Sequence, residues 1–161
     1  MMLSYDSLRA IPVAAFPRGT AIAIGKFDGV HRGHQALLAR ACELAEEHDL
    51  DPIVFTFTEN PQHVLHPELS LPPIMSRRQR LDALADAGIA ACVMVPFDDE
   101  LLAMGAELFA ERVLVRGLRA RTVIVGPDFR FGRGGAGDVA LLAELGERHG
   151  FDVEVIPVVQ D

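Results

Sequence analysis

Apolar residues along the chain fall into short continuous runs, separated by longer segments in which they recur every three or four positions. A continuous apolar run of four to eight residues is typical of a strand buried on both faces. Recurrence every three or four positions predicts a helix with one apolar face. The runs predict strands at residues 20–24, 52–57, 91–96, 121–125 and 151–159. The periodic segments predict helices at residues 34–47, 76–87, 98–105, 106–116 and 138–149.

Residues that start and stop helices support these boundaries. Ser76 is a predicted N-cap, and Gly88 and Gly150 follow the last turns of two helices. Strands that alternate with helices imply an α/β domain whose crossovers are right-handed. The sequence therefore predicts a Rossmann-like, open, mainly parallel five-stranded sheet with helices on both faces. The proline-rich residues 61–73 are predicted to form a surface loop.

Length and composition narrow the class of protein. The 161 residues are expected to form a single domain spanning residues 1–161. No apolar stretch reaches about 18 residues, so no membrane span is expected. A net charge of −8 argues against a nucleic-acid partner, which requires a basic face. The two cysteines, Cys42 and Cys92, form no paired motif, which favours a reducing cytoplasm over a disulfide framework or a thiolate zinc site.

The segment after the first predicted strand carries the candidate chemistry. Ligands of open α/β sheets bind at the carboxyl ends of the strands, where helices begin. Gly25 lets the chain turn off the strand, and Gly29 and Gly33 permit close backbone approach to a ligand. The helix that follows from about His34 presents free N–H groups and a positive dipole end, which together favour a phosphate.

His31 and His34 stand three positions apart at the start of this helix. That spacing puts both imidazoles on one side of the first turn, where each can donate a hydrogen bond to a phosphate oxygen. The same spacing suits two surface residues, or part of a metal site whose third ligand is not adjacent. The glycines and the position after the first strand favour phosphate.

Three stretches resemble a known family. Residues 31–34, His-Arg-Gly-His, resemble the H-x-G-H signature of nucleotidyltransferases. The longer string at residues 25–35 resembles the opening motif of the FMN adenylyltransferase module of bacterial bifunctional FAD synthetases. Residues 125–132, and residues 55–57 running on to Asn60-Pro61, resemble two further strand-end loops of that module. The matches cover nearly the whole chain.

The resemblance implies a reaction and its residues. ATP and FMN would give FAD and pyrophosphate with Mg²⁺ present, and His31 and His34 would be catalytic. The ATP-binding residues would be Gly25, Lys26, Phe27, Asp28, Gly29 and Gly33. The residues near the flavin, its phosphate or a metal-bound water would be Phe57, Asn60, Pro61, Asp128, Phe129 and Arg130. No side chain is predicted to be a direct metal ligand, and the oligomeric state is not predicted.

The sequence also departs from the family pattern. Lys26 stands where asparagine is usual, and Asn60 stands where histidine is common. The I-S-S-T-x-x-R-like segment and the riboflavin kinase module are not found, which predicts weak activity. Two rival functions therefore stay open: transfer to another phosphorylated acceptor, and nucleotide or flavin binding without turnover.

Other motifs have less specific interpretations. Residues 132–137 fit G-x-G-x-x-G, but they lie too late in the chain for a dinucleotide fingerprint. A mobile loop near the ligand is predicted there, with Arg130 and Arg133 available to phosphates, or else a solvated loop. The cluster Arg77, Arg78 and Arg80 is predicted to be a solvated helix face. The remaining histidines are predicted at the surface: His48, His63, His66 and His149.

Overall fold

The sheet is larger than predicted by one strand. The computed structural model describes residues 2–27, 32–58, 76–96 and 98–157. They form a six-stranded sheet with the order β1-β4-β3-β2-β5-β6, in which all neighbouring strands are parallel. The strands are β1 (Leu3–Tyr5), β2 (Thr20–Ile24), β3 (Asp51–Phe57), β4 (Ala91–Val95), β5 (Ala120–Val125) and β6 (Asp152–Val155). The predicted α/β fold with an open parallel sheet is confirmed.

The additional strand, β1, lies at the edge of the sheet. It pairs with β4 from Leu3 opposite Ala91 to Tyr5 opposite Val93. Leu3 and Ser4 are exposed, and Tyr5 is half-buried. A three-residue strand with so little burial has no apolar run, so the hydrophobic pattern misses it.

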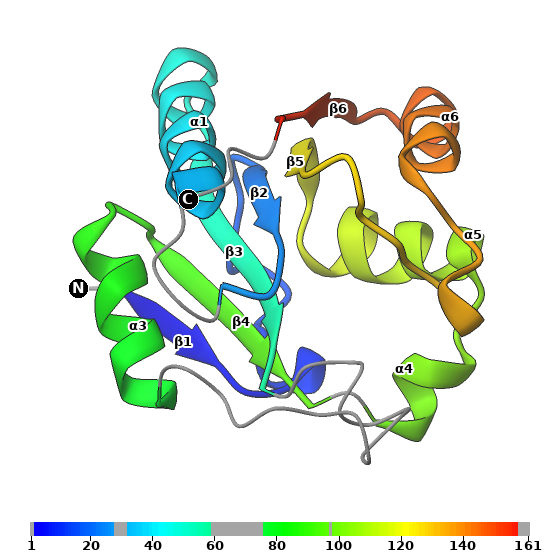
Figure 1. Ribbon diagram of the computed structural model, residues 1–161, viewed down its shortest axis with the longest axis horizontal. Coiled ribbons are helices and arrows are strands. Elements are labelled where there is room, and N and C mark those ends of the chain that lie inside the picture. The colour runs from blue at the N-terminus through cyan, green and yellow to red at the C-terminus, as the bar shows by residue number, and fades with distance from the viewer. Residues whose placement is uncertain (1, 28–31, 59–75, 97, 158–161) are drawn as a thin grey trace.

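Helices cover both faces of the sheet (Figure 1). Two helices, α1 (Arg32–His48) and α3 (Arg77–Asp86), pack on one face, and α6 (Val139–His149) packs on the other. The predicted helix at residues 106–116 is present: one turn of α-helix, α5 (Ala106–Phe109), widens into the π-helix η3 (Ala110–Gly117). The shorter elements are η1 (Leu8–Ala10), α4 (Asp99–Ala103) and η4 (Arg133–Gly135).

The start of α3 confirms a predicted cap. The Ser76 hydroxyl accepts the backbone N–H of Gln79 at 3.1 Å, and the Gln79 side chain accepts the Ser76 N–H at 2.8 Å. This reciprocal capping box satisfies two backbone donors that the first turn of a helix otherwise leaves unpaired. It fixes where α3 begins and therefore which of its side chains face the sheet.

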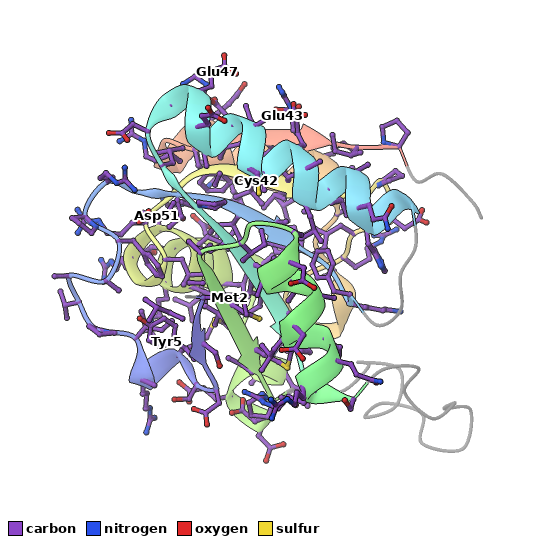
Figure 2. All side chains as sticks on the ribbon, turned by 90° about the vertical axis from the view of Figure 1, so that its left-hand side faces the viewer. Met2, Tyr5, Cys42, Glu43, Glu47 and Asp51 are labelled. Atoms are coloured by element: carbon purple, nitrogen blue, oxygen red, sulfur yellow. The ribbon has the colours of Figure 1, made fainter. Side chains whose placement is uncertain are left out.

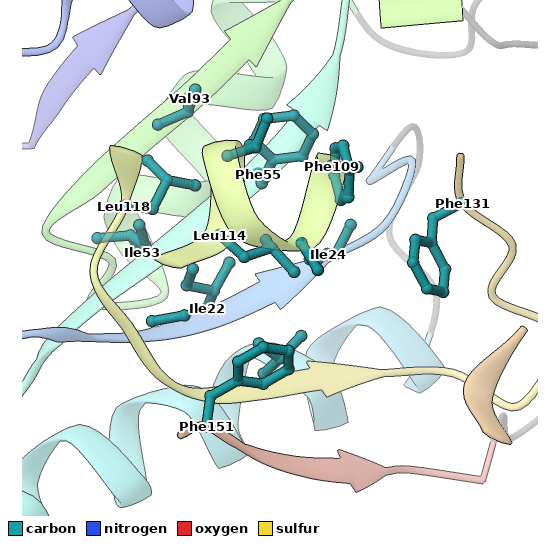
Figure 3. Close-up of a cluster of buried hydrophobic side chains, with 14 of the residues drawn as sticks. Ile22, Ile24, Ile53, Phe55, Val93, Phe109, Leu114, Leu118, Phe131 and Phe151 are labelled. Atoms are coloured by element: carbon teal, nitrogen blue, oxygen red, sulfur yellow. The ribbon is translucent and has the colours of Figure 1, made fainter. Parts of the chain in front are cut away.

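The strands divide their side chains between two apolar layers. Ile22, Ile24 and Phe55 point into the layer covered by α5, η3 and α6, where they meet Phe109 and Leu114 (Figure 3). The alternate strand residues point into the layer beneath α1 and α3: Ala21, Ala23, Val54, Cys92, Met94 and Ile124. Because both faces are covered, strands such as β2 are buried at every position.

The layer beneath α1 is seen from outside in Figure 2. Glu43 and Glu47 project from the outer side of α1, and Cys42 lies on the side toward the sheet. The helix is therefore amphipathic, with an acidic outer face. None of the helices in the described ranges has the combined length and apolar character that crossing a bilayer requires.

The strand order places a topological switch point at the carboxyl end of β2. The chain runs outward from β2 through β3 to β4 on one side, and then returns to add β5 and β6 on the other. Connections that diverge from neighbouring strands in this way open a space at the strand ends, which is the usual ligand position of such sheets. Here that position lies between the ends of β2 and β5.

The glycine-rich residues 132–137 form a closed turn and not a dinucleotide fingerprint. Phe131 and Gly137 exchange backbone hydrogen bonds of 3.1 and 2.8 Å, so the segment is pinned at its base. Gly132 has φ +78°, and a Cβ there would lie 2.7 Å from the backbone N and Cα of Ala106. The turn therefore packs directly against the start of α5.

Alanine substitutions at two glycines of this turn distinguish the cost of a left-handed backbone from the cost of a steric clash. Gly132→Ala should lower the free energy of unfolding by about 3 kcal/mol or more, because φ is positive and the backbone of Ala106 leaves no room for Cβ. Gly134→Ala should cost only about 1 kcal/mol, since φ is +65° but nothing lies within 4 Å of the new Cβ. Urea denaturation measures both, and equal losses would contradict this packing.

Cys92 is a fully buried thiol on β4. Burial raises the pKa of Cys92 from 9.0 to about 11, although the positive charges of Arg80 and Arg77 act to lower it. Burial also raises the pKa of Cys42. Both cysteines are free, and both thiols keep their protons at neutral pH, so neither is a nucleophile there.

This thiol should make the protein less stable in alkali. The unfolded chain loses the proton near pH 9, whereas the folded chain holds it to about pH 11, so the free energy of unfolding falls across that interval. A pKa difference of two units contributes about 2–3 kcal/mol to the free energy of unfolding, and this contribution is complete below pH 9. Urea denaturation of the wild type and of Cys92→Ala should show their difference shrinking from pH 9 to 11. A difference that stays constant with pH would refute the assignment.

Candidate active site

Three strand ends meet at the carboxyl edge of the sheet. Residues 25–27 follow β2, residues 57–58 end β3, and residues 126–130 follow β5. Because β2 is hydrogen-bonded to both β3 and β5, the three segments are neighbours. The amino end of α1 faces the same edge, since Arg32 begins the helix soon after β2 ends. The described residues of the predicted site therefore lie at or near the topological switch point of the sheet.

His34 lies in the first turn of α1 and is half-buried. Its imidazole is 5.2 Å from the Phe27 ring, centroid to centroid, with the planes tilted by 54°. The 17-residue helix directs its first-turn N–H groups and positive dipole end toward the same edge. A histidine and a helix amino end are thus combined where an anion would bind.

Phe27 has a strained backbone and a buried ring. Its φ is +50°, the left-handed region that non-glycine residues avoid, and only 4% of the residue is exposed. A Cβ on Gly25 would lie 3.2 Å from the Phe27 ring, so the missing side chain of Gly25 makes room for it. Phe27, predicted to shape the nucleotide pocket, lies beneath the first turn of α1 and supports His34.

Arg80 joins the ends of β2 and β3 from α3. Its Nη2 atom donates to the Lys26 carbonyl at 2.7 Å, the Phe57 carbonyl at 2.8 Å and the Thr56 hydroxyl at 3.0 Å. Its Nη1 atom lies 3.4 Å from the Thr58 carbonyl. The Thr56 hydroxyl donates to the same Lys26 carbonyl at 3.0 Å. One guanidinium therefore links the two strand ends beside the candidate site.

The prediction of a solvated basic cluster is wrong for Arg80. Arg77 and Arg78 are exposed, but Arg80 is 6% exposed. Arg80 and Leu84 are the two buried residues of α3, and they stand four positions apart on one helix face. That spacing to an apolar residue is the signal in the sequence that could have separated Arg80 from its neighbours.

Aromatic rings run through the core from the end of β3 to the loop after β5. Phe57 contacts Phe55, Phe55 contacts Phe109, and Phe109 contacts Phe131, with centroid distances of 5.5, 5.8 and 6.0 Å. Phe131 is stacked on Phe129 at 5.5 Å with an interplanar angle of 7°. Phe57 and Phe129, both predicted near the flavin, are half-buried members of one connected series.

Some of the residues predicted near the ligand are exposed in the structure, and others lie outside the described residues. Lys26, Asp128 and Arg130 are exposed at the ends of β2 and β5. The other predicted site residues in these loops lie outside the described residues: Asp28, Gly29, His31, Asn60 and Pro61. In the described ranges no three His, Cys, Asp or Glu side chains gather as a metal site.

An ion pair holds α1 against the far edge of the sheet. Arg40, in the middle of the helix, donates from Nε to Glu154 of β6 at 2.7 Å and from Nη1 to Glu43 at 3.1 Å. These hydrogen bonds raise the pKa of Arg40. The contact ties the helix that carries His34 to β6.

Comparisons with known proteins found a matching family model and similar relatives. A family model described as FAD synthetase matches residues 13–161. The bifunctional riboflavin kinase/FMN adenylyltransferase of Escherichia coli (strain K12) is 37% identical over 135 residues, covering 84% of this chain and 43% of that protein. A relative of the same name from Pseudomonas fluorescens is 37% identical over 143 residues, covering 89% of this chain and 46% of that protein. The chain thus spans less than half the length of these two relatives.

Two further comparisons bear on length and on fold. A relative from Geobacillus thermodenitrificans (strain NG80-2), whose name carries the same two activities, is 36% identical over 141 residues, and the match covers 73% of it. A crystal structure titled as a macrolide-efflux protein from Streptococcus pneumoniae superposes with a TM-score of 0.81 at 25% identity. That match covers all of this chain and 52% of the other.

The hydroxyl of Thr56 should contribute measurably to stability. Thr56→Val keeps the shape of the side chain but removes the donor to the Lys26 carbonyl and an acceptor of Arg80. We expect the free energy of unfolding to fall by about 1–3 kcal/mol, because buried partners lose their hydrogen bonds. Thr56→Ser, which keeps the hydroxyl, is the matched control. Urea denaturation should rank Thr56→Val well below Thr56→Ser, and equal stabilities would count against the network.

Proposed function

Because the chain belongs to the FAD synthetase family, we propose that it transfers the adenylyl group of ATP to FMN and so forms FAD and pyrophosphate. The observation that carries the proposal is that His34, the amino end of α1 and the loop after β5 lie at the carboxyl end of β2, where the strand order reverses. This arrangement suits a phosphate-rich substrate on one side and an aromatic one on the other.

The reaction needs alignment more than acid–base chemistry. An oxygen of the FMN phosphate attacks the α-phosphorus of ATP, a new P–O bond forms, and the bond from the α-phosphorus to the bridging oxygen breaks. Pyrophosphate leaves with the bonding electrons. The attacking oxygen is already ionised at neutral pH, so no general base is required. The protein's contribution is orientation and stabilisation of the charge that builds on the phosphoryl oxygens.

The residues divide into two groups in this proposal. His31 and His34, with the N–H groups at the start of α1, donate hydrogen bonds to the triphosphate and to the transition state. Residues 25–29 and Gly33 shape the ATP side. Phe57 and Phe129 offer ring surface to the isoalloxazine, and Arg130 is a cation for the FMN phosphate. Asn60 and Pro61 complete the flavin side.

We propose Mg²⁺ as the ion that accompanies ATP. Mg²⁺ keeps several waters and binds through one or two carboxylates together with phosphate oxygens, so a dedicated cage of protein ligands is not needed. Asp128, exposed at the end of β5, fits that requirement, directly or through water. When bound, the ion would neutralise charge on the triphosphate. We also propose a cytoplasmic location, which the free thiols of Cys42 and Cys92 support.

An assay of ATP and FMN with Mg²⁺ tests the proposal. FAD and pyrophosphate should appear in equal amounts. His34→Gln and His31→Gln should each lower kcat about 10²–10³-fold, the usual effect of losing one transition-state donor. His48→Gln, at the exposed far end of the same helix, should leave kcat unchanged.

Other outcomes of this assay support other functions. Pyrophosphate release that requires a different phosphorylated acceptor would replace FMN as the substrate. Tight binding of ATP and FMN in calorimetry with no pyrophosphate release would make the protein a nucleotide- and flavin-binding module without turnover. Unchanged rates in both histidine variants would refute the assigned roles.

A further inference from the structure

We propose that Arg80 is a positioning residue of the active site, which orients His34 by fixing the peptide between Lys26 and Phe27. The proposal rests on the proposed function, since it assigns the purpose of Arg80 to the same reaction. It links α3, which contributes no predicted substrate contact, to the start of α1, which carries His34. The coupling passes through three contacts.

The first contact is the convergence of hydrogen bonds on one nitrogen of Arg80. Nη2 lies 2.7 Å from the Lys26 carbonyl, 2.8 Å from the Phe57 carbonyl and 3.0 Å from the Thr56 hydroxyl. These acceptors belong to the carboxyl ends of two neighbouring strands, β2 and β3. Because one nitrogen donates to acceptors on both strands, it sets the relative position of the two strand ends.

The second contact fixes a peptide plane. The Lys26 carbonyl accepts from Arg80 at 2.7 Å and from Thr56 at 3.0 Å, so both of its lone pairs have donors. This carbonyl belongs to the peptide that enters Phe27, whose φ of +50° is strained for a non-glycine residue. Such a conformation persists only where the surroundings over-determine it. Arg80 and Thr56 supply that constraint on the side of Lys26.

The third contact carries the constraint to the histidine. The buried Phe27 ring lies 5.2 Å from the His34 imidazole and against Gly25, whose added Cβ would be 3.2 Å from it. A rotation of the peptide at Lys26 would move this ring and the imidazole that rests on it. Misplacing a reacting group by about 1 Å can cost about 100-fold in rate.

The described contacts of Arg80 are directional. Its Nη1 and Nη2 atoms lie within hydrogen-bonding distance of oxygens of Lys26, Thr56, Phe57 and Thr58. An apolar side chain of similar volume could fill the same space, but it could not direct these strand ends.

Steady-state kinetics separates a positioning role from a role limited to stability. Arg80→Met removes the donors at similar length, and Arg80→Lys supplies an ammonium whose three donors can replace the single nitrogen Nη2. We expect Arg80→Met to lower kcat about 30–100-fold with less than threefold change in the KM for ATP. Arg80→Lys should recover most of that loss. Arg78→Met, exposed on the same helix, should behave as the wild type.

A variant destabilised elsewhere shows whether lost stability alone lowers kcat. Leu145→Ala, in the core on the opposite face of the sheet, lowers stability without touching the site. If Arg80→Met and Leu145→Ala lose comparable stability, only Arg80→Met should lose kcat under conditions where both are folded. Equal kcat in the two variants, or no recovery in Arg80→Lys, would overturn the proposal.

A readout that needs no turnover distinguishes failure of this inference from failure of the proposed function. The NMR resonances of the His34 ring, assigned with His34→Gln, should shift in Arg80→Met and stay in place in Arg78→Met. If the wild type makes no FAD while these resonances shift, the function is wrong and the coupling holds. If the wild type makes FAD and the resonances of His34 do not move, the coupling is wrong and the function holds.

Discussion

A parallel sheet buried on both faces can offer polar chemistry only at the ends of its strands. The inner strands β2 to β5 are nearly closed to solvent, because α1 and α3 cover one face and α5, η3 and α6 cover the other. The interior of the sheet has no room for an unsatisfied polar group. The proposed active site therefore lies where the strands end, and the orientation of its side chains depends on how firmly those ends are held.

Two kinds of interaction hold the ends here. On the side of β3, hydrogen bonds from Arg80 and Thr56 converge on the Lys26 carbonyl. On the side of β5, apolar contacts among Phe109, Phe131 and Phe129 anchor the loop from beneath. The polar contacts hold the residue before Phe27, and the aromatic contacts hold Phe129, which the proposal places beside the flavin.

Much of this could be predicted from sequence because it follows from periodicity. Continuous apolar runs located β2 to β6, and the predicted N-cap Ser76 located the start of α3. The position of the candidate site followed from the glycines after the first strand. What could not be predicted depends on tertiary contacts: β1 is too short and too exposed to leave a pattern, and the burial of Arg80 needs knowledge of which strand ends α3 approaches. The left-handed backbone of Phe27 is likewise invisible in a list of residues.

Phe27 keeps a large side chain at a position where the backbone is left-handed. A glycine would adopt the turn with less strain, yet the chain has a large aromatic residue there, packed between Gly25 and His34. At this site a ring that packs against the His34 imidazole is therefore combined with a strained main chain. Among related sequences, loss of the aromatic ring at this position would mark lineages in which the neighbouring histidine no longer needs a fixed orientation.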